Sequence, residues 1–263
     1  MSLSSPRDAS MPRRPRRLLK WITVVILAAI VLTALLVLLL SFCHPYTSAF
    51  MLRARLEAVG AHDTRYQTRY EWVDYRRISP HVALAVIASE DQLFPFHHGF
   101  DVKSIREAEK YNEEGGRVRG ASTISQQLAK NLFLWPGKSY LRKGLEAWFT
   151  VLLETLWPKE RILENYLNIV QFGPGIYGVE AASRTFFHTS AANLTQGEAA
   201  LLAAVLPNPD RLHVDRPSRY VLDRRDWILG QMRTLGGNEY LNSLARGLHR
   251  PPEQPPRPRH ISH

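Results

Sequence analysis

The sequence predicts a mostly α-helical protein with one helix that crosses a membrane. The first observation is an apolar run of twenty residues without a charge, Trp21–Leu40. The second is a set of segments whose apolar residues recur at helical spacing, as they do from Leu145 to Leu156. The third is that the sequence contains neither internal repeats nor a convincing run of alternating apolar and polar residues, which strands would require.

The basic N-terminal tail, residues 1–20, indicates how the chain is oriented in a membrane. The whole chain has a net charge of +10, and the tail holds six basic residues against one acidic residue, Asp8. Basic residues concentrate on the cytoplasmic side of a membrane helix. We therefore expect the tail in the cytoplasm, the remainder of the chain outside it, and no nucleic-acid partner.

Residues 21–43 are interpreted as a retained transmembrane anchor. A cleaved signal peptide is the alternative, but its apolar core would span only about 7–15 residues and end at small residues. Here the bulky Phe42 precedes Cys43, which favours retention and disfavours lipoprotein processing. Because Cys43 is the only cysteine, no disulfide can form within the chain.

Three further segments follow the anchor. Residues 44–78 form an arginine-rich connector that is expected to lie along the anionic membrane surface. The folded domain, residues 79–240, is expected to begin where the capping residue Ser79 precedes Pro80 at the first helical position. Residues 241–263 form a Pro- and Arg-rich tail that is expected to be disordered.

Spacing, caps and breakers place the helices of this domain in order. A further helix starts at Ser122 or Thr123, and residues 173–175 form a glycine-proline loop. The other predicted helices are residues 80–90, which are apolar from Ala83 to Ser89, and residues 145–156, 158–168, 179–187, 197–206 and 223–235.

Glu90 is the first candidate for chemistry. It ends the apolar helix of residues 83–90, where desolvation and the negative end of the helix dipole both raise the pKa of a carboxyl group. A raised pKa suits a general base. From the residues alone, a surface Glu-Asp pair that closes a helix is the more ordinary interpretation.

Glu146 is the second candidate. It lies opposite the apolar stripe of residues 145–156, on the same helix face as Thr150 and Glu154. From the residues alone, a solvated helix face is the favoured interpretation.

Residues 120–131 carry more polar side chains than a helix needs. Ser122 or Thr123 can cap a helix, but the purpose of four other residues is left open by that interpretation: Gln126, Gln127, Lys130 and Asn131. Side-chain amides offer the paired donors and acceptors that sugar hydroxyls require.

A basic cluster follows, formed by Lys130, Lys138 and Arg142. No acidic residue occurs between positions 121 and 145, so the cluster is expected to be unpaired and able to neutralise a diphosphate leaving group. The apolar stretch 132–135 lies between these basic residues. It is expected either in the core or dipping into the bilayer.

Five strings in this order resemble the family 51 peptidoglycan glycosyltransferases, and specifically the monofunctional biosynthetic transglycosylases of Gram-negative bacteria. The resemblance runs from about Arg69 to Arg233 and implies a lysozyme-like helical domain of two lobes with a groove between them. One departure is Phe187–Thr189, where the family usually has an aromatic-Phe-Gly-Lys run. The strings that carry the resemblance are residues 90–101, 120–131, 142–146, 159–168 and 173–180.

The resemblance assigns roles to individual residues. It implies that Glu90 deprotonates the acceptor sugar and that Glu146 positions the donor and supports departure of its pyrophosphate. Lys159 and Asn168 are expected to support the site. The implied substrate-binding residues are Phe94, His97, Gly99, Asp101, Ser122, Thr123, Gln126, Gln127, Lys130, Asn131, Lys138, Arg142 and Lys143.

The resemblance also implies the reaction and its setting. Lipid II would be polymerised into β-1,4-linked glycan with inversion at C1 of the donor and release of undecaprenyl diphosphate. Implied partners are lipid II, the growing strand, membrane lipid, and proteins of cell-wall synthesis or division. The expected location is the inner membrane, with the catalytic domain in the periplasm. No permanent cofactor is expected, although a divalent cation, Mg²⁺ or Mn²⁺, can accompany the substrate diphosphate; the sequence has no metal-ligand spacing for a protein site.

Two other functions are compatible with parts of the sequence. A lysozyme-like lytic enzyme could share the fold, but it would need neither an anchor nor the basic cluster. A non-catalytic, membrane-anchored cell-wall scaffold would not need the carboxyl groups of Glu90 and Glu146.

Overall fold

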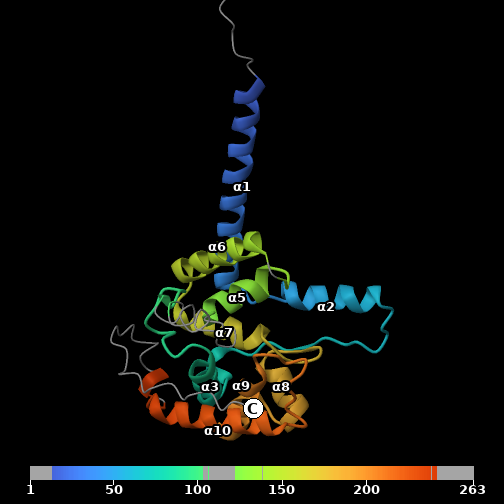
Figure 1. Cartoon of the computed structure of the whole chain (residues 1–263), viewed down its shortest axis with the longest axis vertical. Helices are drawn as coiled ribbons and strands as arrows, with labels where there is room; N and C mark the ends of the chain where they lie inside the picture. The colour runs from blue at the N-terminus through green and yellow to red at the C-terminus, as the bar shows by residue number, and fades with distance from the viewer. Residues whose placement is uncertain (1–13, 103–105, 107–121, 138, 238, 242–263) are drawn as a thin grey trace, which may run out of the picture. The chain divides into compact units, whose positions relative to one another are not determined.

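The computed structural model describes residues 14–102, 106, 122–137, 139–237 and 239–241 (Figure 1). The chain divides into two compact units, Met1–Cys43 and His44–His263, which we describe separately.

The first unit contains helix α1, Arg14–Phe42. Its apolar part, Arg17–Phe42, has 26 residues and contains an 18-residue stretch with a mean hydropathy of 3.2. At 1.5 Å per residue, about 20 residues are enough to cross a hydrocarbon core of about 30 Å. The helix therefore fits a single-pass membrane anchor, and it begins several residues before the predicted start at position 21.

The second unit is built mainly from helices, as the sequence predicted. Its α-helices are α2 Ala49–Gly60, α3 Pro80–Glu90, α5 Ile124–Phe133, α6 Tyr140–Leu156, α7 Lys159–Ile169, α8 Val179–Phe187, α9 Gln196–Val205 and α10 Arg219–Thr234. Among the residues that the structure describes, two short 3-10 helices accompany them, η1 Tyr75–Arg77 and η2 Ala191–Asn193.

A small sheet, absent from the sequence prediction, joins the connector to the domain. Its strands are β1 Arg69–Tyr70, β2 Gln171–Gly173 and β3 Ile176–Tyr177, in the order β1-β3-β2. Strand β3 pairs parallel with β1 and antiparallel with β2. Strands of two or three residues are too short to show an alternating pattern, which is why the sequence did not reveal them.

The helices of the second unit pack in two groups. Helices α3, α9 and α10 pack together, and α5 packs against both α6 and α7 (Figure 1). Helix α3 is apolar on all sides, and its residues from Val82 to Ala88 are all buried. A helix of this kind belongs in a core, so α3 provides a rigid support for the residue at its end, Glu90.

Caps explain where several helices begin. Thr123 forms a capping box with Gln126, and Ser218 accepts a hydrogen bond from Val221 N, so α10 starts four residues before its predicted start. Ser79 stands at the predicted N-cap of α3 but does not cap it. Its hydroxyl instead donates to the carbonyl oxygen of Leu194 at 2.8 Å.

The interpretation of α6 as a helix with one solvated polar face is wrong. Glu146 is 3% exposed and Thr150 is completely buried, whereas Val151 is 47% exposed. The polar face of α6 therefore points into the domain. That burial requires partners for the carboxyl group of Glu146.

The departure at Phe187–Thr189 has a simple backbone consequence. His188 ends α8 in the left-handed conformation, with φ of 55°, and its N–H bonds to the carbonyl oxygen of Ser183. This is the helix-ending conformation that glycine adopts most readily. The histidine thus preserves the turn that a glycine would make.

Candidate active site

Glu90 is contacted from both groups of helices. Gln127 Nε2, on α5, donates to Glu90 Oε2 at 2.9 Å, and Arg224 Nη2, on α10, lies 3.4 Å from Oε1. Burial raises the pKa of Glu90, as we predicted from its place at the end of an apolar helix. The hydrogen bond from Gln127 and the charge of Arg224 lower this pKa and partly oppose the effect of burial. The carboxyl group is thus both desolvated and held by one donor on each oxygen.

Tyr166 fixes the orientation of the Gln127 amide. Its hydroxyl donates to Gln127 Oε1 at 3.0 Å, so the NH₂ group of the amide is directed to Glu90. Burial, and then the charges of Glu90 and Asp91, raise the pKa of Tyr166 well above its ordinary value. The phenol therefore remains a neutral donor at physiological pH.

Asp91 is a structural residue of the site that was not among the sequence candidates. Its carboxylate binds His97 Nε2 at 2.9 Å and accepts from Ile124 N at 2.9 Å. Because Gly99 N donates to His97 Nδ1 at 3.1 Å, the proton of the ring belongs on Nε2. Asp91 thereby ties the end of α3 to the start of α5, and its position next to Glu90 was the available sequence signal.

The other predicted residues of the first string are buried or make contacts within the domain. Phe94 is completely buried, with Lys159 Nζ 4.5 Å from its ring centroid, and Asp101 is 9% exposed. Gly99 has a φ of +83°, and a Cβ there would lie 2.6 Å from a Thr150 methyl carbon. These residues shape the site from inside, and their direct contact with substrate stays a prediction.

Some residues of the second string cap helix α5, and others belong to the candidate site. Thr123 donates to the carbonyl oxygen of Gly99 at 2.7 Å, and Gln126 Oε1 accepts from Thr123 N at 3.0 Å. The side-chain amide of Gln126 is thus hydrogen-bonded to the backbone. Ser122 is exposed, Asn131 is 8% exposed, and the sugar contacts expected of this string remain predictions.

Lys130 lies within the electrostatic reach of both carboxylates. Burial lowers its pKa, and so do Arg142 and Lys143, whereas Glu146 and Glu90 raise it. Its Nζ is 5.7 Å from the ring centroid of Phe50 on α2. Among the residues that the structure describes, no carboxylate forms an ion pair with Lys130.

The expectation of an unpaired basic cluster is wrong for Arg142. Its Nη1 donates to Glu146 Oε2 at 2.9 Å, and Lys143 Nζ contacts Glu146 Oε1. The glutamate follows Arg142 by one helical turn, just beyond the stretch without acidic residues, so the pair forms within α6. Lys138 lies outside the described residues.

The two supporting residues make contacts within the protein. Lys159 Nζ pairs with Glu154 Oε1 at 2.8 Å, and Ser125 also donates to that carboxylate. Asn168 is completely buried and exchanges two hydrogen bonds of 2.9 Å with the backbone of Val73. Both residues join separate segments of the domain.

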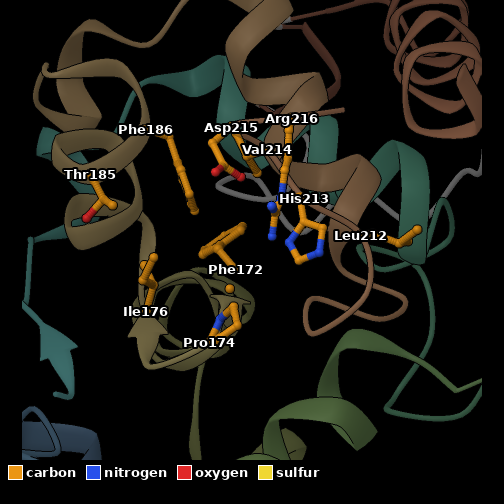
Figure 2. Close-up of a pocket in the computed structure, with 11 residues that line it drawn as sticks. Phe172, Pro174, Ile176, Thr185, Phe186, Leu212, His213, Val214, Asp215 and Arg216 are labelled. Carbon is orange, nitrogen blue, oxygen red and sulfur yellow. The ribbon is translucent and has the colours of Figure 1, made fainter. Parts of the chain in front are cut away.

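A separate cavity of about 270 Å³ lies between β2, β3, α8 and the segment before α10 (Figure 2). Phe172, Phe186, His213 and Arg216 are among the residues around it, and none of the predicted site residues lines it. In the described part of the chain, no group of three or more His, Cys, Asp or Glu residues is placed to hold a metal ion.

A buried glutamate and a half-buried one, both within electrostatic reach of the partly buried Lys130, fit an enzyme that makes or breaks glycosidic bonds. Comparison with known proteins narrows this class. The family model described as "Transglycosylase" matches residues 57–233, and the chain belongs to this family.

Relatives match over most of the chain. A protein of Xanthomonas euvesicatoria pv. vesicatoria is 49% identical over 240 residues, which cover 91% of this chain and 97% of the relative. A protein of Pseudomonas fluorescens is 53% identical and covers 81% of this chain and 88% of its own length. A protein of Stutzerimonas stutzeri is 51% identical, with 87% and 94% covered. Each of the three is named "Biosynthetic peptidoglycan transglycosylase".

Proposed function

We propose that this chain is a peptidoglycan glycosyltransferase that polymerises lipid II in cell-wall synthesis. The observation that carries the proposal is the pair of carboxyl groups, Glu90 and Glu146, that both act on the partly buried cation of Lys130. Membership of the transglycosylase family and the names of the relatives support the same activity.

Glu90 serves as the general base. In its ionised form, it takes the proton from the 4-hydroxyl of the acceptor N-acetylglucosamine while that oxygen attacks C1 of the donor N-acetylmuramic acid. The new bond is a β-1,4 linkage with inversion at C1, and the bond from C1 to the diphosphate breaks. The raised pKa of the desolvated carboxyl supports this role, because a stronger base accepts the proton more readily.

Glu146 and the basic residues around it act on the diphosphate of the donor substrate. Arg142 and Lys143 are both held by Glu146, which fixes two cations within electrostatic reach of the partly buried Lys130. Since Lys130 has no carboxylate ion-pair partner among the described residues, it is the cation best suited to the diphosphate that leaves with undecaprenol. A divalent cation, if present, would be carried by that diphosphate.

The catalytic domain acts at the outer face of the inner membrane, in the periplasm. Support comes from helix α1 and from the basic residues that precede it. Trp135, Tyr140 and Leu141 add exposed apolar surface between α5 and α6, with exposed fractions of 48%, 98% and 71%. Such residues suit contact with the lipid part of the substrate and with the bilayer. Proteins of cell-wall synthesis or division are proposed as partners.

Polymerisation of labelled lipid II by the purified full-length protein tests this function. The expected product is high-molecular-weight glycan that a muramidase converts to disaccharide-peptides. Parallel incubation with preformed glycan distinguishes the lytic alternative, which would shorten those strands and leave lipid II unchanged. A protein with neither activity would instead be the non-catalytic scaffold.

A further inference from the structure

The ion pair between Glu90 and Arg224 joins the first string of polar residues to the last described helix of the domain. The two residues are 134 positions apart in the sequence, and the Arg224 position belongs to none of the five strings. Glu90 is 13% exposed and Arg224 is 21% exposed at the side chain. The pair is therefore shielded from water on most sides, where a charge acts more strongly than at a surface.

The guanidinium group of Arg224 forms its ion pair with Glu90. Its Nη2 lies 3.4 Å from Glu90 Oε1, and its Nε is buried without an acceptor among the described residues. The Trp227 ring lies 5.8 Å from the guanidinium carbon, one turn further along α10. No described carboxylate other than Glu90 pairs with this arginine, so its charge acts mainly on the candidate base.

Helix α10 is fixed in register beside α3. Gln92 Nε2 donates to Gln231 Oε1 at 2.9 Å, and Tyr240 donates to the carbonyl oxygen of Gln92. These contacts lie next to Glu90 in the chain and hold α10 where Arg224 can reach the carboxylate.

We propose that Arg224 is a positioning residue for glycosyl transfer, which keeps the Glu90 carboxylate ionised and oriented while the domain buries it. This inference rests on the proposed role of Glu90 as the base. Gln127 holds one carboxylate oxygen by a neutral hydrogen bond, and Arg224 supplies positive charge at the other. Without that charge, burial would leave more of the base protonated and unable to accept a proton.

Charged groups at the end of α3, on α5 and on α10 act on the carboxyl group of Glu90. Asp91 at the end of α3 raises the pKa of Glu90, whereas Lys130 on α5 and Arg224 on α10 lower it, with Arg224 acting more strongly than Lys130. Tyr166 on α7 stays neutral. Arg224 is thus the principal cation that opposes the burial of the base.

The test is the pH dependence of kcat/KM for lipid II with the full-length protein. Replacing Arg224→Gln removes the charge, so the pKa of Glu90 should rise and the acid limb of the profile should move upward by about one pH unit. At a pH below the limb, kcat/KM should fall about tenfold, and it should recover substantially as the pH is raised. Arg224→Lys should restore most of the original limb.

Arg225→Gln is the matched control. Arg225 is the next residue of the same helix, and it pairs with the neighbouring Asp226 at 2.7 Å. The variant loses the same charge, yet its acid limb should not move. Arg224→Met, which keeps the hydrocarbon stem, replaces Arg224→Gln if circular dichroism shows that the glutamine variant is unfolded.

An unchanged acid limb in the folded Arg224 variants, or a loss of rate that is equal at every pH, would overturn the proposal and make Arg224 a packing residue. Glu90→Gln separates this outcome from failure of the proposed function. If Glu90→Gln is inactive and the Arg224 variants keep the original limb, only the role of Arg224 is wrong. If Glu90→Gln polymerises normally, the assignment of the base is wrong.

Discussion

At the scale of single residues, packing gives similar side chains different roles: some contact the candidate catalytic residues, and others hold the backbone in place. Gln126 and Gln127 are adjacent amides, yet Gln126 closes a capping box while Gln127 donates to Glu90. Sequence alone could not separate them, because the direction of each side chain depends on how α5 packs. Asp91 and Arg224 escaped prediction for the same reason, since their partners lie 33 and 134 residues away.

The first prediction concerns Glu90→Gln. It should lower turnover of lipid II by about 100-fold or more, the usual effect of removing a general base. The folded-state pKa of Glu90 is raised, so the carboxyl favours folding at low pH and that contribution disappears as the pH rises through the folded-state value. At pH 8, the glutamine variant should therefore melt at the same temperature as the wild type or higher.

Two measurements decide this prediction, polymerisation rate and melting temperature. Glu160→Gln, at an exposed position of α7, is the control and should keep normal turnover. Near-normal polymerisation by Glu90→Gln would show that the carboxylate is dispensable.

The second prediction concerns Lys130→Ala. The variant should lose most lipid II polymerisation and bind pyrophosphate-mimicking inhibitors much more weakly. Thermal stability should change little, because folding a partly buried ammonium group that has no carboxylate ion-pair partner among the described residues costs free energy. Inhibitor titration and thermal melting of the same preparation make the comparison. A variant that melts early but polymerises normally while folded would mark Lys130 as structural.

At the scale of helices, the sequence predicted most elements because their apolar spacing and breakers are local signals. Helix α8 has the predicted bounds, and α9 differs from its prediction by one residue at each end. Helix α6 was located well but its buried side was misjudged. The partly buried Leu145–Leu156 stripe resembled a core face, whereas the burial of Glu146 depends on ion pairs and tertiary packing that no helical period encodes.

The third prediction concerns the end of α8. His188→Gly should stabilise the domain by about 0.5–1 kcal/mol, because a left-handed residue with a side chain is strained there and glycine is not. For a domain of this size, the melting temperature should rise by roughly 1–4 °C. His188→Ala, which keeps the Cβ, should give no such gain. A glycine variant that melts at or below the wild-type temperature would contradict the explanation.

At the scale of the whole molecule, the chain combines an apolar helix that fits a membrane anchor with a transglycosylase domain. The charge asymmetry around α1 is readable directly from the sequence, since it depends on composition and not on packing. The domain is different, because its site is assembled from α3, α5, α6 and α10, and only their folding brings the charged groups together.

The fourth prediction concerns topology. A reporter that is active only outside the cytoplasm, fused after residue 235, should be active, because basic residues before a membrane helix favour a cytoplasmic N-terminus. The protein should also remain in the membrane fraction at full length. Inverting the charge of the tail, with its six basic residues changed to glutamate, is the control and should reduce reporter activity. Recovery of a shortened soluble protein that begins after Cys43 would establish cleavage.

The long separation between Glu90 and Arg224 also sets the order in which the two residues of this ion pair are synthesised. Ribosomes add about 5–20 residues per second, so the 134 residues between the two side chains take roughly 7–27 s to synthesise. The candidate base is therefore synthesised well before the arginine that is proposed to support it. A nascent chain halted before α10 would lack Arg224, so the proposed site is complete only when synthesis is nearly finished.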